Sequence, residues 1–126
     1  MTQLAVVVAL VLLGALAVLQ VLLAAGAPLG RYVWGGGHDV LPRGLRIASA
    51  ASVLLYAGFA LLLLDRAGLT DVLPDTVARV GTWVLLGYLV LGAPTNALSR
   101  SRREALVMTP TCLVLAACAL VVATSA

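Results

Sequence analysis

One segment of the chain gathers residue types that can do chemistry. Within residues 30–43, three successive glycines at 35–37 are followed by His38 and Asp39. A histidine beside a carboxylate can act as a general acid or base. Neighbours in sequence do not generally face one another, however, and glycines and Asp are also typical of a turn. We favour the turn and expect no catalytic residue here.

The same segment could bind an anion. Backbone amides of glycines can approach an anionic group closely, and Arg31, Arg43 and His38 would assist them. The competing interpretation is that Trp34 belongs to an aromatic belt at a membrane surface and that His38 is solvated. Arg46 follows shortly after. These five residues are candidate contacts to a ligand or a lipid headgroup.

A second polar group surrounds two prolines near the end of the chain. Pro94 is followed by Thr95 and Asn96, and Thr109 precedes Pro110. A proline inside a helix leaves one backbone carbonyl without its partner, and neighbouring polar side chains can satisfy that carbonyl. The alternative is a small polar pocket that faces residues 30–43 and is lined by Asn96, Thr109 and loop arginines.

Signatures of metal, redox or cofactor chemistry are missing from the sequence. The two cysteines, Cys112 and Cys118, are six residues apart and lack the C-x-x-C spacing of such sites. The phosphate-binding motif G-x-x-x-x-G-K-[ST] is also missing. We therefore expect no metal and no cofactor.

The elements that must position these residues follow from composition. Hydrophobic residues make up 63% of the 126 residues and charged residues 10%, against about 25% charged in a soluble domain. A membrane-crossing helix needs about 20 apolar residues, and four segments meet that length without an ionisable group in the middle. We predict an all-α fold, a four-transmembrane-helix bundle running up-down-up-down with short loops.

Residues 1–126 should form a single integral membrane domain. Its helices are expected at about residues 4–29, 46–64, 76–98 and 102–124. The first apolar run is longer than the core of a signal peptide, and Met1 to Gln3 carry no positive charge. We expect it to be retained.

Helix-capping signals agree with these boundaries. Asp75 follows Pro74 and is placed to cap the third helix. Ser101 and Glu104 match the capping box S-x-x-E, in which each side chain satisfies a free backbone amide. The fourth helix should begin at Arg102, so the third and fourth helices form a tight antiparallel hairpin.

The arginines predict an orientation. All eight basic residues are Arg, and six of them lie in the loop of residues 30–46 and the turn of residues 99–102 with its flanks. Arginine-rich loops face the cytoplasm, so both termini should lie outside. Three of the six, Arg100, Arg102 and Arg103, are further candidate contacts to anionic headgroups. Nucleic acid is not expected as a partner, because the net charge is only +3.

The order of several short motifs resembles that of a known group of proteins. Gly26-x-Pro-x-Gly30 ends the first apolar run, Trp34-Gly-Gly and Val40-Leu-Pro follow, and Arg46 opens the second run. This layout resembles small four-helix membrane proteins of high-GC bacteria to which no activity is assigned. The resemblance implies the architecture only, and no site residues. Ala, Leu, Val and Gly dominate the composition, as in proteins of high-GC bacterial genomes. We therefore expect a bacterial inner-membrane protein.

Three functions compete. The favoured one is a non-enzymatic protein that acts by association with anionic lipid, with itself or with a membrane partner. The second is an oligomeric transporter or channel subunit, because four helices alone enclose little space. The third is a membrane enzyme on a lipid or hydrophobic substrate, with His38 or Asp39 as its acid or base.

Overall fold

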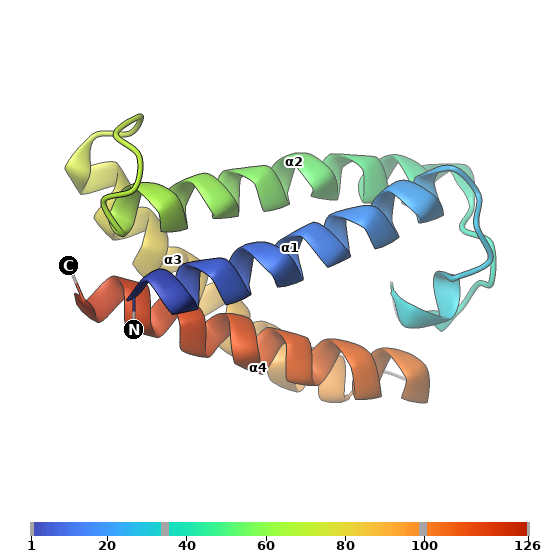
Figure 1. The fold of residues 1–126 in the computed structure, drawn as a ribbon. Helices are drawn as coiled ribbons and strands as arrows, with labels where there is room; N and C mark the ends of the chain where they lie inside the picture. The colour runs from blue at the N-terminus through green and yellow to red at the C-terminus, as the bar shows by residue number, and fades with distance from the viewer. Residues whose placement is uncertain (1, 34–35, 99–100, 126) are drawn as a thin grey trace.

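The chain folds into four long helices and one short 3-10 helix (Figure 1). A computed structural model describes residues 2–33, 36–98 and 101–125, and no strand occurs among them. The helices are α1 (Thr2–Ala24), η1 (Gly30–Tyr32), α2 (Arg43–Arg66), α3 (Asp75–Ala97) and α4 (Arg102–Ser125). The predicted all-α four-helix bundle is confirmed.

Each of the four helices is long and apolar enough to cross a membrane. Large apolar side chains point away from the bundle on all of them; Leu54 is 77% exposed and Leu91 71%. Water would make such a surface unfavourable on every side of the molecule, whereas hydrocarbon accepts it. The protein is therefore a multi-pass membrane protein.

The helices pack as two antiparallel pairs. α1 packs along α2 and α3 along α4, while α1 also contacts α4 and α2 contacts α3. Figure 1 shows the two pairs close together near Thr2 and Ser125 and diverging toward the opposite end. We call that opposite end, formed by residues 25–33, 36–42, 98 and 101 with the first turns of α2 and α4, the arginine-rich end.

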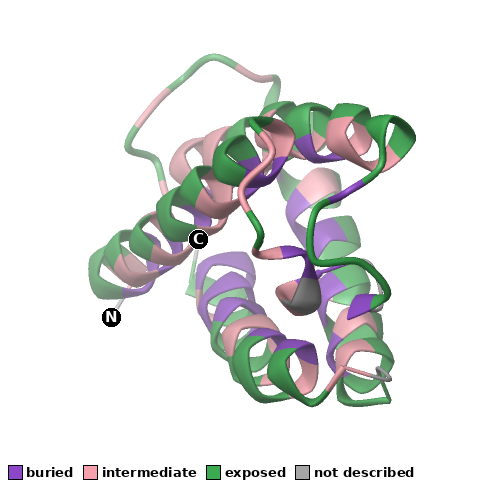
Figure 2. Ribbon diagram, turned by 90° about the vertical axis from the view of Figure 1, so that its right-hand side faces the viewer, coloured by how far each residue is buried: buried purple, intermediate pink, exposed green. Residues whose placement is uncertain are grey.

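The described residues between α1 and α2, 25–33 and 36–42, fold back over the gap between the two pairs, and we call them the closing connection. Val33 and Leu41 are buried and pack with Leu23 of α1 and Met108 of α4. Figure 2, which faces this end, shows η1 lying between the pairs. A larger apolar core, which includes Ala9, Ala119 and Val122, fills the other half of the bundle. The connection thus closes one end of the bundle.

The first helix is shorter than predicted. It ends at Ala24 rather than near residue 29, because Gly26 adopts a left-handed conformation with φ of 99°. The N–H of Ala27 then bonds the carbonyl of Leu22 at 2.9 Å, the arrangement that terminates helices at glycine. Five residues predicted as membrane span belong instead to the closing connection.

Capping at the third and fourth helices differs from expectation in one case and agrees in the other. Pro74, not Asp75, is the residue before α3, and no side chain caps this end. Pro74 already has the extended backbone of a cap, so Asp75 becomes the first helical residue, where its charge suits the helix dipole. In α4, the N–H of Glu104 donates to the hydroxyl of Ser101 at 3.3 Å, as predicted.

Candidate functional sites at the arginine-rich end

A cavity of about 200 Å³ lies between the four helices, beneath η1. It occupies the half of the bundle in which the two helix pairs diverge. Its walls are formed by Leu13, Leu16, Gln20, Tyr32, Val33, Ser52, Leu55, Tyr56, Phe59, Tyr88, Leu89, Asn96, Glu104, Met108, Thr111, Cys112 and Leu115.

Aromatic side chains are concentrated in these walls. All three tyrosines of the chain and its single phenylalanine line the cavity. The rings of Phe59 and Tyr88 are 5.7 Å apart and tilted, and those of Tyr56 and Phe59 are 6.4 Å apart. Spacings and tilts of this kind are favourable for aromatic pairs. The cavity therefore has a firm apolar wall along α2 and α3.

The most buried polar group of the walls is the amide of Gln20. Its side chain is 4% exposed, and its Nε2 donates to the Tyr56 hydroxyl at 3.3 Å. Its Oε1 is buried and has no hydrogen-bond partner within the described part of the protein. Exchanging the amide nitrogen and oxygen would leave the nitrogen unpaired instead, so one amide atom stays without a partner in either assignment.

Other polar groups of the walls are already engaged. Asn96 donates from Nδ2 to the Cys112 sulfur at 3.1 Å. The hydroxyls of Ser52 and Thr111 donate to backbone carbonyls one turn earlier in their own helices. This back-bonding is typical of Ser and Thr in apolar helices. The single O–H donor of each hydroxyl is therefore occupied, whereas the Asn96 amide has a second N–H beside the one that bonds Cys112.

Glu104 brings a carboxylate to the cavity. It lies in the first turn of α4, is 7% exposed and forms part of the wall. No arginine is among the lining residues that the structure describes. Asn96, around which the sequence predicted a pocket, lines this cavity. Thr109 is not among the described lining residues, and its buried hydroxyl has no partner among them. Arg43, Arg46, Arg102 and Arg103 do not line the cavity either.

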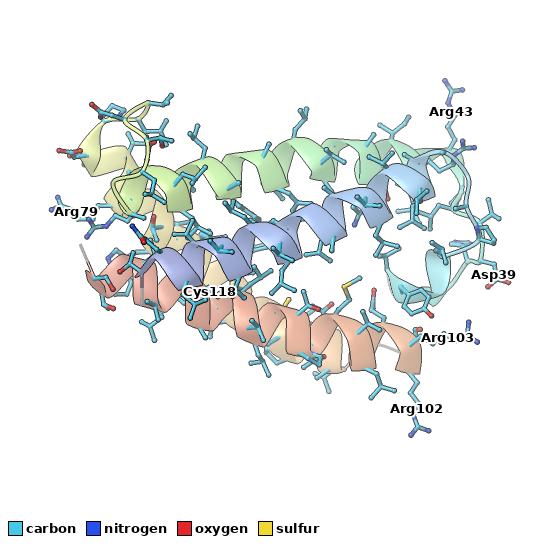
Figure 3. All side chains as sticks on the ribbon, viewed as in Figure 1. Asp39, Arg43, Arg79, Arg102, Arg103 and Cys118 are labelled. Atoms are coloured by element: carbon cyan, nitrogen blue, oxygen red, sulfur yellow. The ribbon has the colours of Figure 1, made fainter. Side chains whose placement is uncertain are left out.

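The arginines instead surround the cavity's end of the bundle. Arg43, Arg102 and Arg103 are exposed and point outward from it (Figure 3). Arg46 has a structural contact, since its Nε donates to the carbonyl of Ala24 at 2.9 Å and so satisfies a free carbonyl at the end of α1. Trp34, Arg100 and the side chain of Arg31 lie outside the described residues.

His38 and Asp39 are exposed and line no part of the cavity. Their backbone has a clearer role, because the Asp39 carbonyl accepts the N–H of Gly30 at 2.8 Å. A methyl group added to Gly30 would lie 2.0 Å from the carbonyl oxygen of His38. The backbone of His38 and Asp39 therefore lies directly against Gly30, and these contacts fix the path of the closing connection.

Among the residues that the structure describes, no three His, Cys, Asp or Glu side chains gather as metal ligands would. Cys112 and Cys118 form no disulfide. No protein-family model, no curated protein and no solved structure matches the chain.

Proposed function

We propose that this is a non-enzymatic protein of the bacterial inner membrane that binds anionic lipid headgroups through its arginine-rich end. The observation that carries the proposal is the placement of Arg43, Arg102 and Arg103. All three are exposed and point outward at one end of the bundle.

Electrostatics favour lipid phosphates as the counterions of these side chains. Arg102 and Arg103 open α4, where the positive end of the helix dipole disfavours cations. Attraction to an anionic membrane surface contributes about 1 kcal/mol per arginine and offsets this cost. Guanidinium groups also bind phosphate oxygens in pairs.

Charge at the opposite end supports the proposed orientation. There, Arg66 and Arg79 are accompanied by Asp65, Asp71 and Asp75, and Arg66 donates to the Ala123 carbonyl at 3.4 Å. The arginine-rich end therefore belongs in the cytoplasmic leaflet by the positive-inside tendency, with both termini outside.

A binding role fits the exposed surface better than catalysis does. His38 and Asp39, the acid–base pair that the sequence offered, face outward beside the headgroup region and away from the cavity. An acid–base pair acts best on a substrate that it can orient in a closed site.

The proposal is tested by lipid-dependent stability in detergent. Phosphatidylglycerol should raise the melting temperature of the wild-type protein more than phosphatidylcholine does, because ligands that bind only the folded state stabilise it. The triple variant R43A/R102A/R103A should lose this preference. Three arginines at about 1 kcal/mol each correspond to on the order of 100-fold in affinity, and high salt should weaken it.

Arg79→Ala is the matched control, since it removes an exposed arginine from the opposite end. It should keep the wild-type preference. Equal stabilisation of the wild type by the two lipids, or an undiminished preference in the triple variant, would contradict the proposed function.

A further inference from the structure

We propose that the cavity beneath η1 binds an uncharged, membrane-dissolved amphiphile whose small head carries a hydrogen-bond acceptor, such as a carbonyl oxygen, for the amide of Asn96. The apolar part of this ligand would leave the cavity between α2 and α3. The exposed arginines take no part in this site, so its test is independent of headgroup binding.

The cavity opens onto hydrocarbon near the middle of the membrane. Leu55 and Tyr88 line it and are 46% and 57% exposed. Each lies close to the middle of its helix, α2 or α3, and therefore near the centre of a bilayer that these helices span. At the arginine-rich end, Tyr32 and the buried Val33 of the closing connection line the cavity. A ligand would therefore enter from the lipid between α2 and α3, which diverge toward that end (Figure 1).

The depth of this opening determines the charge of the ligand. A charged group at the centre of a bilayer is strongly unfavourable, so an ion would leave the headgroup region at high cost before it reached Leu55 and Tyr88. An uncharged amphiphile dissolves in the hydrocarbon and reaches the opening without this cost. The ligand is therefore uncharged.

Asn96 requires an acceptor from its ligand. Its Nδ2 donates one N–H to the Cys112 sulfur at 3.1 Å, and a thiol sulfur is a weak acceptor. The second N–H has no acceptor among the described residues. Exchanging the amide nitrogen and oxygen would leave two N–H groups without acceptors, so at least one donor is available in either assignment. A ligand oxygen that accepts from this donor removes the cost of leaving it unpaired.

Asn96 is accessible from the cavity, unlike the amide oxygen of Gln20. Gln20 is 4% exposed, and its Oε1 is enclosed by the protein. Asn96 is only partly buried and lines the cavity, and its amide is not among the enclosed side-chain groups that lack a partner. It lies in the last turn of α3, so a ligand that hydrogen-bonds to it has its head at the arginine-rich end and its apolar part toward the membrane centre.

The volume and the walls limit the size of the head. An apolar protein cavity of about 150 Å³ accommodates benzene, and this one measures about 200 Å³. The Phe59 ring, 5.7 Å from that of Tyr88 and 6.4 Å from that of Tyr56, forms an apolar wall. The head is therefore a ring or a few carbons with its acceptor, while any longer chain stays in the bilayer.

Photo-crosslinking in phosphatidylcholine nanodiscs tests the site directly. The probes are a long-chain alkylcyclohexanone with a diazirine on the first carbon of its chain, the alkylcyclohexane that lacks the carbonyl, and the analogue with a sulfonate in its place. The ketone should label Leu89 and Leu115, which line the cavity but are only 6% and 3% exposed. It should half-saturate at about ten-fold lower concentration than the hydrocarbon, the ratio that one net hydrogen bond gives. The sulfonate should not label these two residues.

Asn96→Leu should bring the ketone to the half-saturation of the hydrocarbon, because the donor is gone. Thr95→Val is the matched control. It removes a hydroxyl from the neighbouring residue, which is exposed and bonds the Leu91 carbonyl of its own helix outside the described cavity wall. This variant should keep the ten-fold preference for the ketone.

A second variant tests occupancy of the cavity without changing the Asn96 amide. Ser52→Leu adds bulk to the cavity wall from α2 and should abolish labelling of Leu89 and Leu115 by every probe. Ala51→Leu adds the same side chain on the exposed surface of α2 and should leave the labelling unchanged. Melting temperatures in detergent show that each variant is folded.

Three results would overturn the proposal. The first is equal half-saturation by ketone and hydrocarbon in the wild-type protein. The second is labelling confined to exposed residues of the four helices, which is contact with surrounding lipid only. The third is a sulfonate probe that labels Leu89 and Leu115 as well as the ketone does.

Discussion

At Gly30 the lack of a side chain allows the closing connection to cover the end of the bundle. Its N–H bonds the carbonyl of Asp39, and the carbonyl of His38 occupies the space that a Cβ would need. The three consecutive glycines at 35–37 are more conspicuous in the sequence than Gly30. Gly37, however, has open space around its Cβ position. A run of glycines therefore did not indicate which glycine is sterically constrained.

Gly30→Ala should destabilise the closing connection by roughly 1–3 kcal/mol, the usual cost of forcing an extra methyl into a packed site. Denaturant unfolding in detergent and proteolysis within residues 25–42 measure the effect. Gly44→Ala is the control, because nothing lies within 4 Å of its Cβ position and it sits in α2. There, alanine should be neutral or stabilising. Equal behaviour of the two variants would exclude a tight contact at Gly30.

The residues of the cavity were only partly predictable. Asn96 was predicted as a candidate because it lies two residues after Pro94, and a proline followed by polar residues is unusual inside an apolar span. Gln20 and Tyr56 are 36 residues apart and meet only through the relative rotation of α1 and α2. The spans are apolar on all faces, so hydrophobic periodicity does not tell which side of each helix faces inward. Glu104 was recognised as a cap, but its burial depends on the same unknown rotation.

The connections between helices hold more structure than their length suggests. Asp65, in the last turn of α2, accepts hydrogen bonds from the Thr70 hydroxyl and from the N–H groups of Val72 and Leu73. In the sequence, Asp65 is only one of three acidic residues near Arg66 and Arg79. A carboxylate with several donors instead organises the whole of residues 67–74.

Replacing Asp65 with alanine should free this connection without unfolding the bundle. Hydrogen exchange of the Val72 and Leu73 amides should accelerate to the rate of unprotected loop amides, because their acceptor is gone. Amides within α1 and α4 should keep their protection. Asp71→Ala removes an exposed carboxylate of the same connection and serves as the control. Unchanged exchange at Val72 in the Asp65 variant would show that the carboxylate does not hold this connection.

Helix boundaries were predictable where a cap or a charge marked them, and less so elsewhere. The start of α4 at Arg102 was fixed by Ser101 and Glu104, whose capping contact is present. The end of α1 was missed because residues 25–29 carry no polar side chain. The apolar segment therefore extends beyond Gly26, where the backbone turns and the helix has already ended. Hydropathy reports the medium around a segment and not its backbone conformation.

The two ends of the molecule differ, and this difference relates the fold to the membrane that surrounds it. The helix pairs converge at one end and diverge at the other, and the diverging end carries both the cavity and the exposed arginines (Figures 1 and 3). Four nearly uncharged helices can enter a bilayer in either direction. By the positive-inside tendency, the arginines would determine which leaflet receives the arginine-rich end.

The proposed orientation predicts the behaviour of reporters fused after the last residue. Alkaline phosphatase, which is active only outside the inner membrane, should be active there, and a fluorescent protein that folds in the cytoplasm should stay dark. In R43A/R102A/R103A, three arginines remain on the cytoplasmic side against two outside, so both reporters should give signal from a mixed population. Arg79→Ala strengthens the bias and should leave the wild-type pattern intact. A fluorescent C-terminal fusion of the wild-type chain would invert the molecule and place the cavity and the arginines in the outer leaflet.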